Sequence, residues 1–252
     1  MNRLSWIAGI VLLFASTSLA QQTVYFPQIA NGMENGTMVH WHTTVFVDNQ
    51  GTGVASGTIS LINSDGTPMQ ASFVDESGNA AARNGQINFQ LGPGQSHKYT
   101  STASNPLQVG YGVMTTNAPV AANVLFSHYS GGGAEYLIAE AGVPSTTPMG
   151  KQAIFVDTQF GFNAGVAIAN PTTSTQVISL DLVDAGGRVV MSTTQTLGPG
   201  QHFAKFLTEM FPDIPAMAGR LQFQASAPLA ALALRFDKTY SLFTTLFPFQ
   251  VP

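Results

Sequence analysis

A five-residue block that occurs twice constrains this chain more than any other feature. The block LGPGQ at 91–95 recurs unchanged at 197–201. Other similar blocks occur in the same order, namely 45–49 with 166–170, 61–66 with 182–187, Gly110 with Gly219, and 118–122 with 227–231. Blocks that repeat in one order predict an internal duplication in which each copy is a structural unit. Between the block at 61–66 and the LGPGQ block at 91–95, the first copy has about 15 more residues than the second copy has between the corresponding blocks.

Alternating apolar and polar residues predict that each copy is built from strands. In 57–63, Ile59 and Leu61 lie two residues apart, and 86–91 alternates in the same way. Asp65-Gly66 is a turn signal between such runs. The other expected strands are 39–48, 107–116, 120–129, 153–157, 165–170, 176–183, 188–195, 221–225 and 229–236. Six or seven short strands in about 100 residues are typical of an immunoglobulin-like sandwich.

The sequence therefore predicts an all-β protein of two tandem immunoglobulin-like β-sandwich domains that arose by internal duplication. The expected domains are 21–145 and 150–252, with a linker at 146–149. A single jelly roll over the whole chain is the alternative. One short helix is expected in the second copy, because apolar residues recur at helical spacing between Phe203 and Phe211 and Pro212 ends the pattern.

The first twenty residues have the pattern of a secretory signal peptide. Arg3 precedes the apolar run at 6–15, and Ser18-Leu19-Ala20 is a small-residue cleavage site. We expect an exported chain in the periplasm, on the cell surface or outside the cell, with no membrane insertion after the signal peptide is removed. An uncleaved N-terminal anchor is the alternative.

Composition excludes several classes of function. Charged residues make up only 9% of the chain and the formal net charge is −4, which argues against nucleic-acid binding. Cysteine is absent, so disulfides, thiolate metal sites and a cysteine nucleophile are excluded. An exported chain without disulfides depends on core burial for its stability.

His40-Trp41-His42 is the motif that most suggests a metal site. Residues two apart on a strand point the same way, so both imidazoles could approach one ion. A metal site needs a third ligand, which His97 or His128 would supply only if the fold brought them near. We interpret the pair as histidines on a solvated strand face beside a core Trp41, and we expect no cofactor.

No motif of a catalytic nucleophile, a P-loop or a dinucleotide site occurs in the sequence, so we expect no catalytic residue. Asp75 and Glu76 are the only adjacent acidic pair, and neighbours on a strand point to opposite faces. They lie with Arg83 in the additional segment of the first copy. Added loops on a rigid sandwich commonly bind partners, so Asp75, Glu76 and Arg83 are the candidate binding-loop residues.

The second copy resembles a repeat of uncharacterised secreted bacterial proteins with tandem immunoglobulin-like β-sandwich repeats. The resemblance rests on VAIANP at 166–171, LGPGQH at 197–202 and PLAA at 228–231. These are strand and turn elements, so the resemblance implies a fold and transfers no catalytic residue. We expect a non-catalytic envelope or extracellular module that binds a glycan or a surface protein. The alternatives are a secreted hydrolase with a scattered site and a metal-binding periplasmic protein that uses His40 and His42.

Export gives a direct test of the N-terminal interpretation. Mass spectrometry of the exported protein should show Gln21 as the first residue, because the small residues at 18–20 fit the signal-peptidase site. An exported protein that retains Met1 would contradict the signal-peptide prediction.

Overall fold

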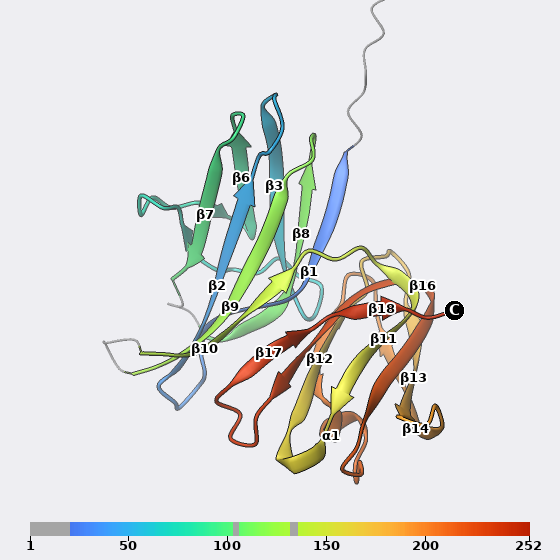
Figure 1. The fold of residues 1–252 in the computed structure, drawn as a ribbon. Coiled ribbons are helices and arrows are strands. Elements are labelled where there is room, and N and C mark those ends of the chain that lie inside the picture. Colours follow the sequence, from blue (N-terminus) through green and yellow to red (C-terminus); the bar gives the residue numbers. More distant parts are fainter. Residues whose placement is uncertain (1–20, 103–105, 132–135) are drawn as a thin grey trace, which may run out of the picture.

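The described part of the chain is of β type apart from two short helical turns. The structure, a computed structural model, describes residues 21–102, 106–131 and 136–252. The predicted signal peptide at 1–20 lies outside the described residues. The described chain forms two antiparallel sheets, one of ten strands and one of eight (Figure 1). The all-β prediction is confirmed.

The first sheet curls into a nearly closed barrel. Its strands are β1 (Gln22–Met33), β2 (Val39–Asp48), β3 (Ala55–Asn63), β4 (Phe73–Val74), β5 (Ala82–Arg83), β6 (Gln86–Leu91), β7 (Ser96–Ser101), β8 (Gln108–Thr116), β9 (Ala121–Ser130) and β10 (Tyr136–Pro144). Eight of them follow the order β10-β9-β2-β1-β8-β3-β6-β5, and β7 pairs with β2 and β4. Strand β1 pairs along most of its length with β8, and its last residues pair with β2. It thus connects the two walls of the barrel.

The second sheet uses one long strand for the same purpose. Its strands are β11 (Met149–Asp157), β12 (Asn163–Ala169), β13 (Gln176–Asp184), β14 (Val189–Leu197), β15 (His202–Phe206), β16 (Ala218–Phe236), β17 (Phe243–Leu246) and β18 (Pro248–Gln250). The first part of β16 pairs with β11 and β13, and its last part pairs with β12 and β17. The strands expected at 221–225 and 229–236 are therefore one continuous strand.

The same side-chain bonds hold the two LGPGQ turns. The Asn49 side-chain amide donates to the carbonyl oxygens of Gly53, Leu91 and Gly92. In the second sheet the Asn170 amide donates to the corresponding oxygens, those of Ser174, Leu197 and Gly198. A glutamine inside each turn, Gln95 or Gln201, accepts the N–H of its first glycine. The repeated sequence therefore forms a repeated local structure.

Gly110 and Gly219 also have matching surroundings. Gly110 pairs with Asn63 on β3, and Gly219 pairs with Asp184 on β13. A Cβ atom at Gly110 would lie 1.8 Å from the carbonyl oxygen of Ile62, and one at Gly219 would lie 2.1 Å from that of Val183. Real contacts are never so short, so both positions require glycine for close approach of the backbones.

The additional segment of the first copy closes the barrel edge. Phe73 and Val74 in β4 pair with β7, whereas Ala82 and Arg83 in β5 pair with β6. Met69 and Phe73 are buried in the core. The added loop predicted from the sequence is thus a segment that crosses from β7 to β6 and contributes to the core.

The helix of the second copy is shorter than its sequence pattern. Only α1 (Leu207–Met210) is helical, and Phe203 and Phe206 belong to β15. The Glu209 carboxylate accepts a hydrogen bond of 2.6 Å from the backbone N–H of Phe206, and this bond caps the start of the helix. A second turn, η1 (Gln159–Gly161), connects β11 to β12. The apolar spacing arises because Phe203 faces the core from a strand and Leu207 and Met210 face it from the helix.

Both sheets share the largest apolar core. Leu232, Leu234, Phe236 and Phe243 of the second sheet belong to the same buried cluster as Phe126 of the first. The expected linker is also fixed, because Thr146 and Tyr25 exchange two backbone hydrogen bonds of 3.1 and 2.7 Å. The sheets therefore pack against each other along a continuous apolar seam.

Burial at the end of the repeated block predicts a large loss of stability on truncation. Leu197 is only 4% exposed, so Leu197→Ala should lower the free energy of unfolding by about 2–5 kcal/mol in urea denaturation. Val177 on the neighbouring strand β13 is 62% exposed, and Val177→Ala is the control, with an expected change below about 0.5 kcal/mol. Equal effects of the two substitutions would contradict the packing described for β14.

Candidate functional site

A cavity of about 590 Å³ lies on the seam between the two sheets. Its volume is within the range of small-molecule sites, about 300–1,000 Å³. Strands β1, β2, β8 and β9 form one side, and β12, β15 and β16 form the other. Most of the lining is apolar, including Ala30, Val109, Val166, Leu232 and Leu234. Neither sheet makes this cavity alone.

Aromatic rings cover both sides of the cavity. On the first sheet, Trp41 stacks on His128 with ring centroids 4.4 Å apart and on Phe126 at 4.7 Å. On the second sheet, Phe206 meets Phe236 and Tyr240 edge to face, each at 5.1 Å. All six residues line the cavity. Such a wall can hold a flat or apolar molecule by stacking and dispersion.

Two polar groups in the wall have unused hydrogen-bonding capacity. Gln28 is 5% exposed, and its side-chain oxygen Oε1 has no hydrogen-bond partner among the described residues. Neither ring nitrogen of His128 has one there either. Burial lowers the pKa of His128, so the ring is neutral at pH 7 and offers one donor and one acceptor. All three atoms are enclosed by the protein, so they are exceptions to the rule that buried polar groups are paired.

A β-bulge explains how Gln28 comes to line the cavity. Phe26 pairs with Gly112 and Ile29 pairs with Gly110, so β1 has one residue more than β8 over this interval. A bulge breaks the inward and outward alternation of a strand and redirects a side chain. Pro27, which has no N–H to donate to the ladder, lies at this point. The bulge thus interrupts the alternation of β1, and the Gln28 side chain lies on the side of the strand that lines the cavity.

The charged groups of the lining are already engaged. Glu34 accepts the indole N–H of Trp41 at 2.8 Å, and Glu209 accepts the backbone N–H of Phe206. The Lys205 ammonium donates to Gln195 at 2.8 Å. These bonds hold the aromatic wall in place and leave Gln28 and His128 as the unpaired polar groups.

A second polar contact of the seam involves a serine and a histidine. His202 Nδ1 lies 3.0 Å from Ser64 Oγ, and this hydroxyl donates to the carbonyl oxygen of Val109 at 2.9 Å. The backbone N–H of His202 also donates to the carbonyl oxygen of Ser64. His202 is buried and Ser64 is half-buried, and their contact connects the two sheets.

The structure separates the histidines singled out in the sequence. His42 is buried, with Nδ1 2.8 Å from the carbonyl oxygen of Ser101 and its ring edge on Tyr129, so it does not lie on a solvated face. Trp41 packs against the core, as expected. His128 of β9 pairs directly with Trp41 of β2, so the two side chains lie on the same face of the sheet. His97 pairs with Glu76 elsewhere. Among the described residues no three His, Asp or Glu side chains gather as a metal site would require.

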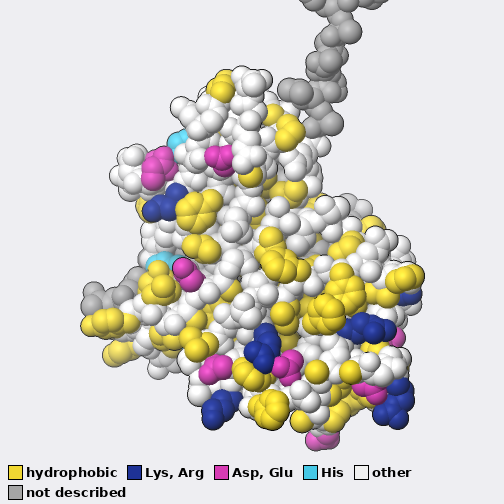
Figure 2. Space-filling model, in the orientation of Figure 1, with side chains coloured by type: hydrophobic (Ala, Val, Ile, Leu, Met, Phe, Trp, Pro, Cys, Tyr) yellow, Lys and Arg dark blue, Asp and Glu magenta, His cyan; other side chains and the backbone are white. Residues whose placement is uncertain are grey.

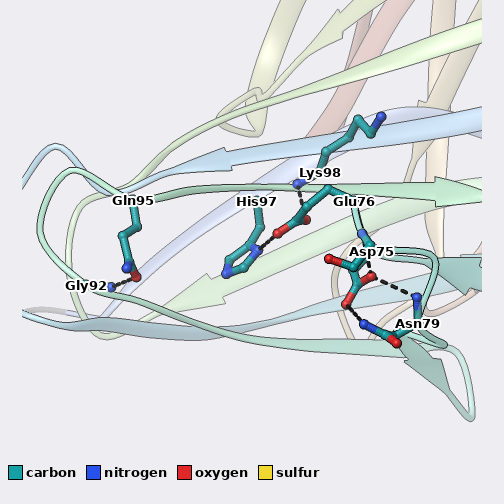
Figure 3. A network of polar contacts seen from close by, with 8 residues as sticks. Asp75, Glu76, Asn79, Gly92, Gln95, His97 and Lys98 are labelled. Carbon is teal, nitrogen blue, oxygen red and sulfur yellow. Dashed lines mark hydrogen bonds and ion pairs between the residues drawn. The ribbon is translucent and has the colours of Figure 1, made fainter.

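The candidate binding-loop residues do not line the cavity but lie at the barrel edge. Figure 3 shows the polar contacts of Asp75 and Glu76. Asp75 accepts the backbone N–H groups of Ser77 and Asn79, which shapes the turn after β4. Glu76 contacts His97 Nδ1 at 2.6 Å. Arg83 is exposed on β5. The first two residues therefore stabilise the segment that closes the barrel.

An exposed aromatic pair lies on the outer side of the second sheet. Phe155 on β11 is 63% exposed, and its ring centroid lies 4.8 Å from that of Phe249 on β18. Figure 2 shows apolar side chains gathered where these two strands lie. Exposed apolar groups that gather on a face can mark an interaction surface.

Sequence reasoning missed the cavity because its residues come from distant segments. Gln28 and Phe206 have no motif around them, and only the pairing of the sheets brings them to one place. The one usable signal was Pro27 inside an apolar run, which indicates an interrupted strand.

No protein-family model matches the sequence, and no curated protein matches it significantly. Within the described residues, no helix has the length and apolar character needed to cross a membrane. The proposed function therefore rests on the geometry of the cavity.

The buried histidine of the seam predicts a loss of stability in acid. Burial lowers the pKa of His202 from 6.5 to about 4. Between these values the unfolded chain binds a proton that the folded chain does not, so the free energy of unfolding should fall by roughly 3 kcal/mol from pH 6.5 to 4. Urea denaturation at several pH values should show this fall in the wild type and a smaller one in His202→Gln. If the free energy of unfolding fell equally in both proteins between pH 6.5 and 4, His202 would not be the cause of the loss.

Proposed function

We propose that this chain is an exported, non-catalytic binding protein that holds a small ligand in the cavity between its two sheets. The observation that supports this function best is a cavity of about 590 Å³ with aromatic rings on both sides, a volume within the range of small-molecule sites.

The engaged state of the reactive groups supports a non-catalytic function. Ser64 and His202 form a serine–histidine pair, and the serine hydroxyl also contacts the backbone carbonyl oxygen of Val109. Glu34 and Glu209 accept hydrogen bonds that organise the cavity wall. These groups therefore give little support to the alternative of a secreted hydrolase. The buried position of His42, with Nδ1 at the carbonyl oxygen of Ser101, gives no support to the alternative of a metal-binding protein.

The repeated turns support the finer description of the fold as two tandem immunoglobulin-like units from one duplication. The amides of Asn49 and Asn170 make corresponding bonds, and Gly110 and Gly219 have corresponding close contacts. Strands β6-β3-β8-β1 and β14-β13-β16-β11 occur in corresponding orders. On this proposal the cavity arose when two copies of one unit packed together. Export is proposed from the signal-peptide pattern at 1–20.

A glycan or a surface protein, the partner expected from the sequence, is the second candidate. The exposed pair of Phe155 and Phe249 supports it, because apolar rings in water favour contact with a partner. This face is separate from the cavity, so a probe of the cavity distinguishes the two candidates.

The cavity function is tested with Nile red, an uncharged apolar dye. The full chain should bind about one equivalent with increased fluorescence, because the dye fits an apolar site of this volume. Ala204 lines the cavity and is exposed, so Ala204→Phe should narrow the site without disturbing the core and weaken binding at least tenfold.

Ala218→Phe is the matched control, because Ala218 is an exposed strand residue outside the cavity lining. This variant should bind Nile red like the wild type. Absence of binding, or equal binding by the two variants, would reject the cavity function and leave the outer aromatic face as the better-supported site.

A further inference from the structure

We infer that the ligand of the cavity is an organic cation, namely an alkylated ammonium group carried on an apolar body. This inference rests on the proposed binding function and specifies its ligand class. Its basis is the sign of the charges that face the cavity and the series of rings that lies between them.

Glu34 places one carboxylate at the aromatic wall. Its Oε1 accepts the indole N–H of Trp41 at 2.8 Å, and both residues line the cavity. Burial lowers the pKa of His128, and the negative charge of Glu34 acts in the opposite direction, so this carboxylate lies close to the imidazole of the same wall. Its second oxygen, Oε2, has no hydrogen bond with a described residue and is accessible to solvent.

Glu209 places a second carboxylate at the opposite wall. Its Oε2 accepts the backbone N–H of Phe206 at the start of α1, and both residues line the cavity. Glu209 is an exposed residue of the lining, so its charge lies at the opening of the cavity and not in a closed interior.

A continuous series of rings connects the two carboxylates. The ring centroid of Trp41 lies 6.0 Å from that of Phe243, which lies 5.1 Å from that of Phe236. Phe206 continues the series at 5.1 Å from Phe236, and Tyr240, which is 45% exposed, lies 5.1 Å from Phe206. Aromatic rings attract cations through their quadrupole, and quaternary ammonium groups are bound in such surroundings.

Lys205, the one lysine or arginine among the described residues that line the cavity, directs its charge elsewhere. Side chains alternate along β15, so Lys205 lies on the same side as Phe203 and opposite to Phe206. Its ammonium lies 5.6 Å from the centroid of the Phe203 ring and donates to Gln195 at 2.8 Å. Neither of these two partners lines the cavity. The fixed charges that face the cavity are therefore those of the two carboxylates.

This arrangement discriminates between ligands by their charge. Both carboxylates would repel an anion, and a neutral molecule would gain only the ring contacts. A cation gains the attraction of carboxylates and rings together. An ammonium group whose hydrogens are replaced by alkyl groups also needs few hydrogen-bond acceptors, which suits a lining that is mostly apolar.

The test compares three probes of similar shape: phenyltrimethylammonium, its neutral carbon isostere tert-butylbenzene, and the anion benzenesulfonate. The probes are titrated against the fluorescence of the full chain with Trp6→Phe, which leaves Trp41 as the only tryptophan. The cation should bind about tenfold more tightly than the isostere, because attraction by rings and carboxylates supports a factor of this size. The anion should bind more weakly than the isostere.

Salt provides a second measurement that needs no substitution in the cavity. Raising sodium chloride from about 20 mM to about 500 mM should reduce the preference for the cation, because screening weakens charge attraction. The affinity for tert-butylbenzene should not fall, since ring contacts are not screened. A preference for the cation that is independent of salt would contradict the role of the carboxylates.

Glutamine at either carboxylate identifies the charges. Glu34→Gln and Glu209→Gln keep an oxygen that can accept the existing hydrogen bond, so the wall should keep its shape. Each variant should lower the ratio of cation to isostere affinity about threefold, while the affinity for tert-butylbenzene is kept. Glu140→Gln is the control, because Glu140 accepts a hydrogen bond from Ser127 and lies outside the cavity lining. It removes the same charge and should keep the ratio.

The outcomes separate this inference from the proposed function. If no probe changes the Trp41 fluorescence and Nile red does not bind, the cavity function itself fails. If Nile red binds but the isostere or the anion binds as tightly as the cation, the cavity function stands and the ligand class inferred here is rejected. The same rejection follows if neither Glu34→Gln nor Glu209→Gln lowers the ratio.

Discussion

Apolar packing between the two sheets is the interaction on which the rest of the structure depends. Without cysteine the chain has no covalent cross-link, so burial must hold the sheets together. Leu232, Leu234 and Phe236 of β16 enter the core cluster of the first sheet. Each fully buried side chain of this kind contributes about 1.5–3 kcal/mol. The cavity, the Ser64–His202 contact and the aromatic wall all lie on this seam and exist only while it is packed.

The seam combines a polar contact with an opening that small residues keep free. The hydrogen bond between Ser64 and His202 joins the two sheets. In the cavity lining, Gly165 lies so close to the rings of Phe236 and Phe206 that an added Cβ would be only 3.2 Å from the nearest ring atom. A rigid frame with a few small residues in its wall is suited to a preformed site, since ligand binding then requires little ordering of the protein.

Much of the fold could be predicted from local pattern, and particular residues show why. Strand β6 has the expected bounds because its apolar residues alternate over its full length, and β2 has them because it is rich in β-branched and aromatic residues. Strand β1 was missed because it is buried along most of both faces and contains Pro27, so it shows no alternation. The helical spacing around Phe203 was misleading, since buried positions on a strand and on a following turn can mimic one helix.

By itself, the sequence determined the strand content, the repeated turns and the absence of cross-links. These depend on local properties: alternation, the freedom of Gly94 and Gly200 to adopt positive φ, and the side-chain reach of Asn49 and Asn170. Only the tertiary structure decided where Gln28, Trp41 and Phe206 meet, and that Asp75 and Glu76 serve the barrel edge. The reason is physical, because a cavity between two sheets depends on long-range packing of segments that carry no mark of one another in the chain.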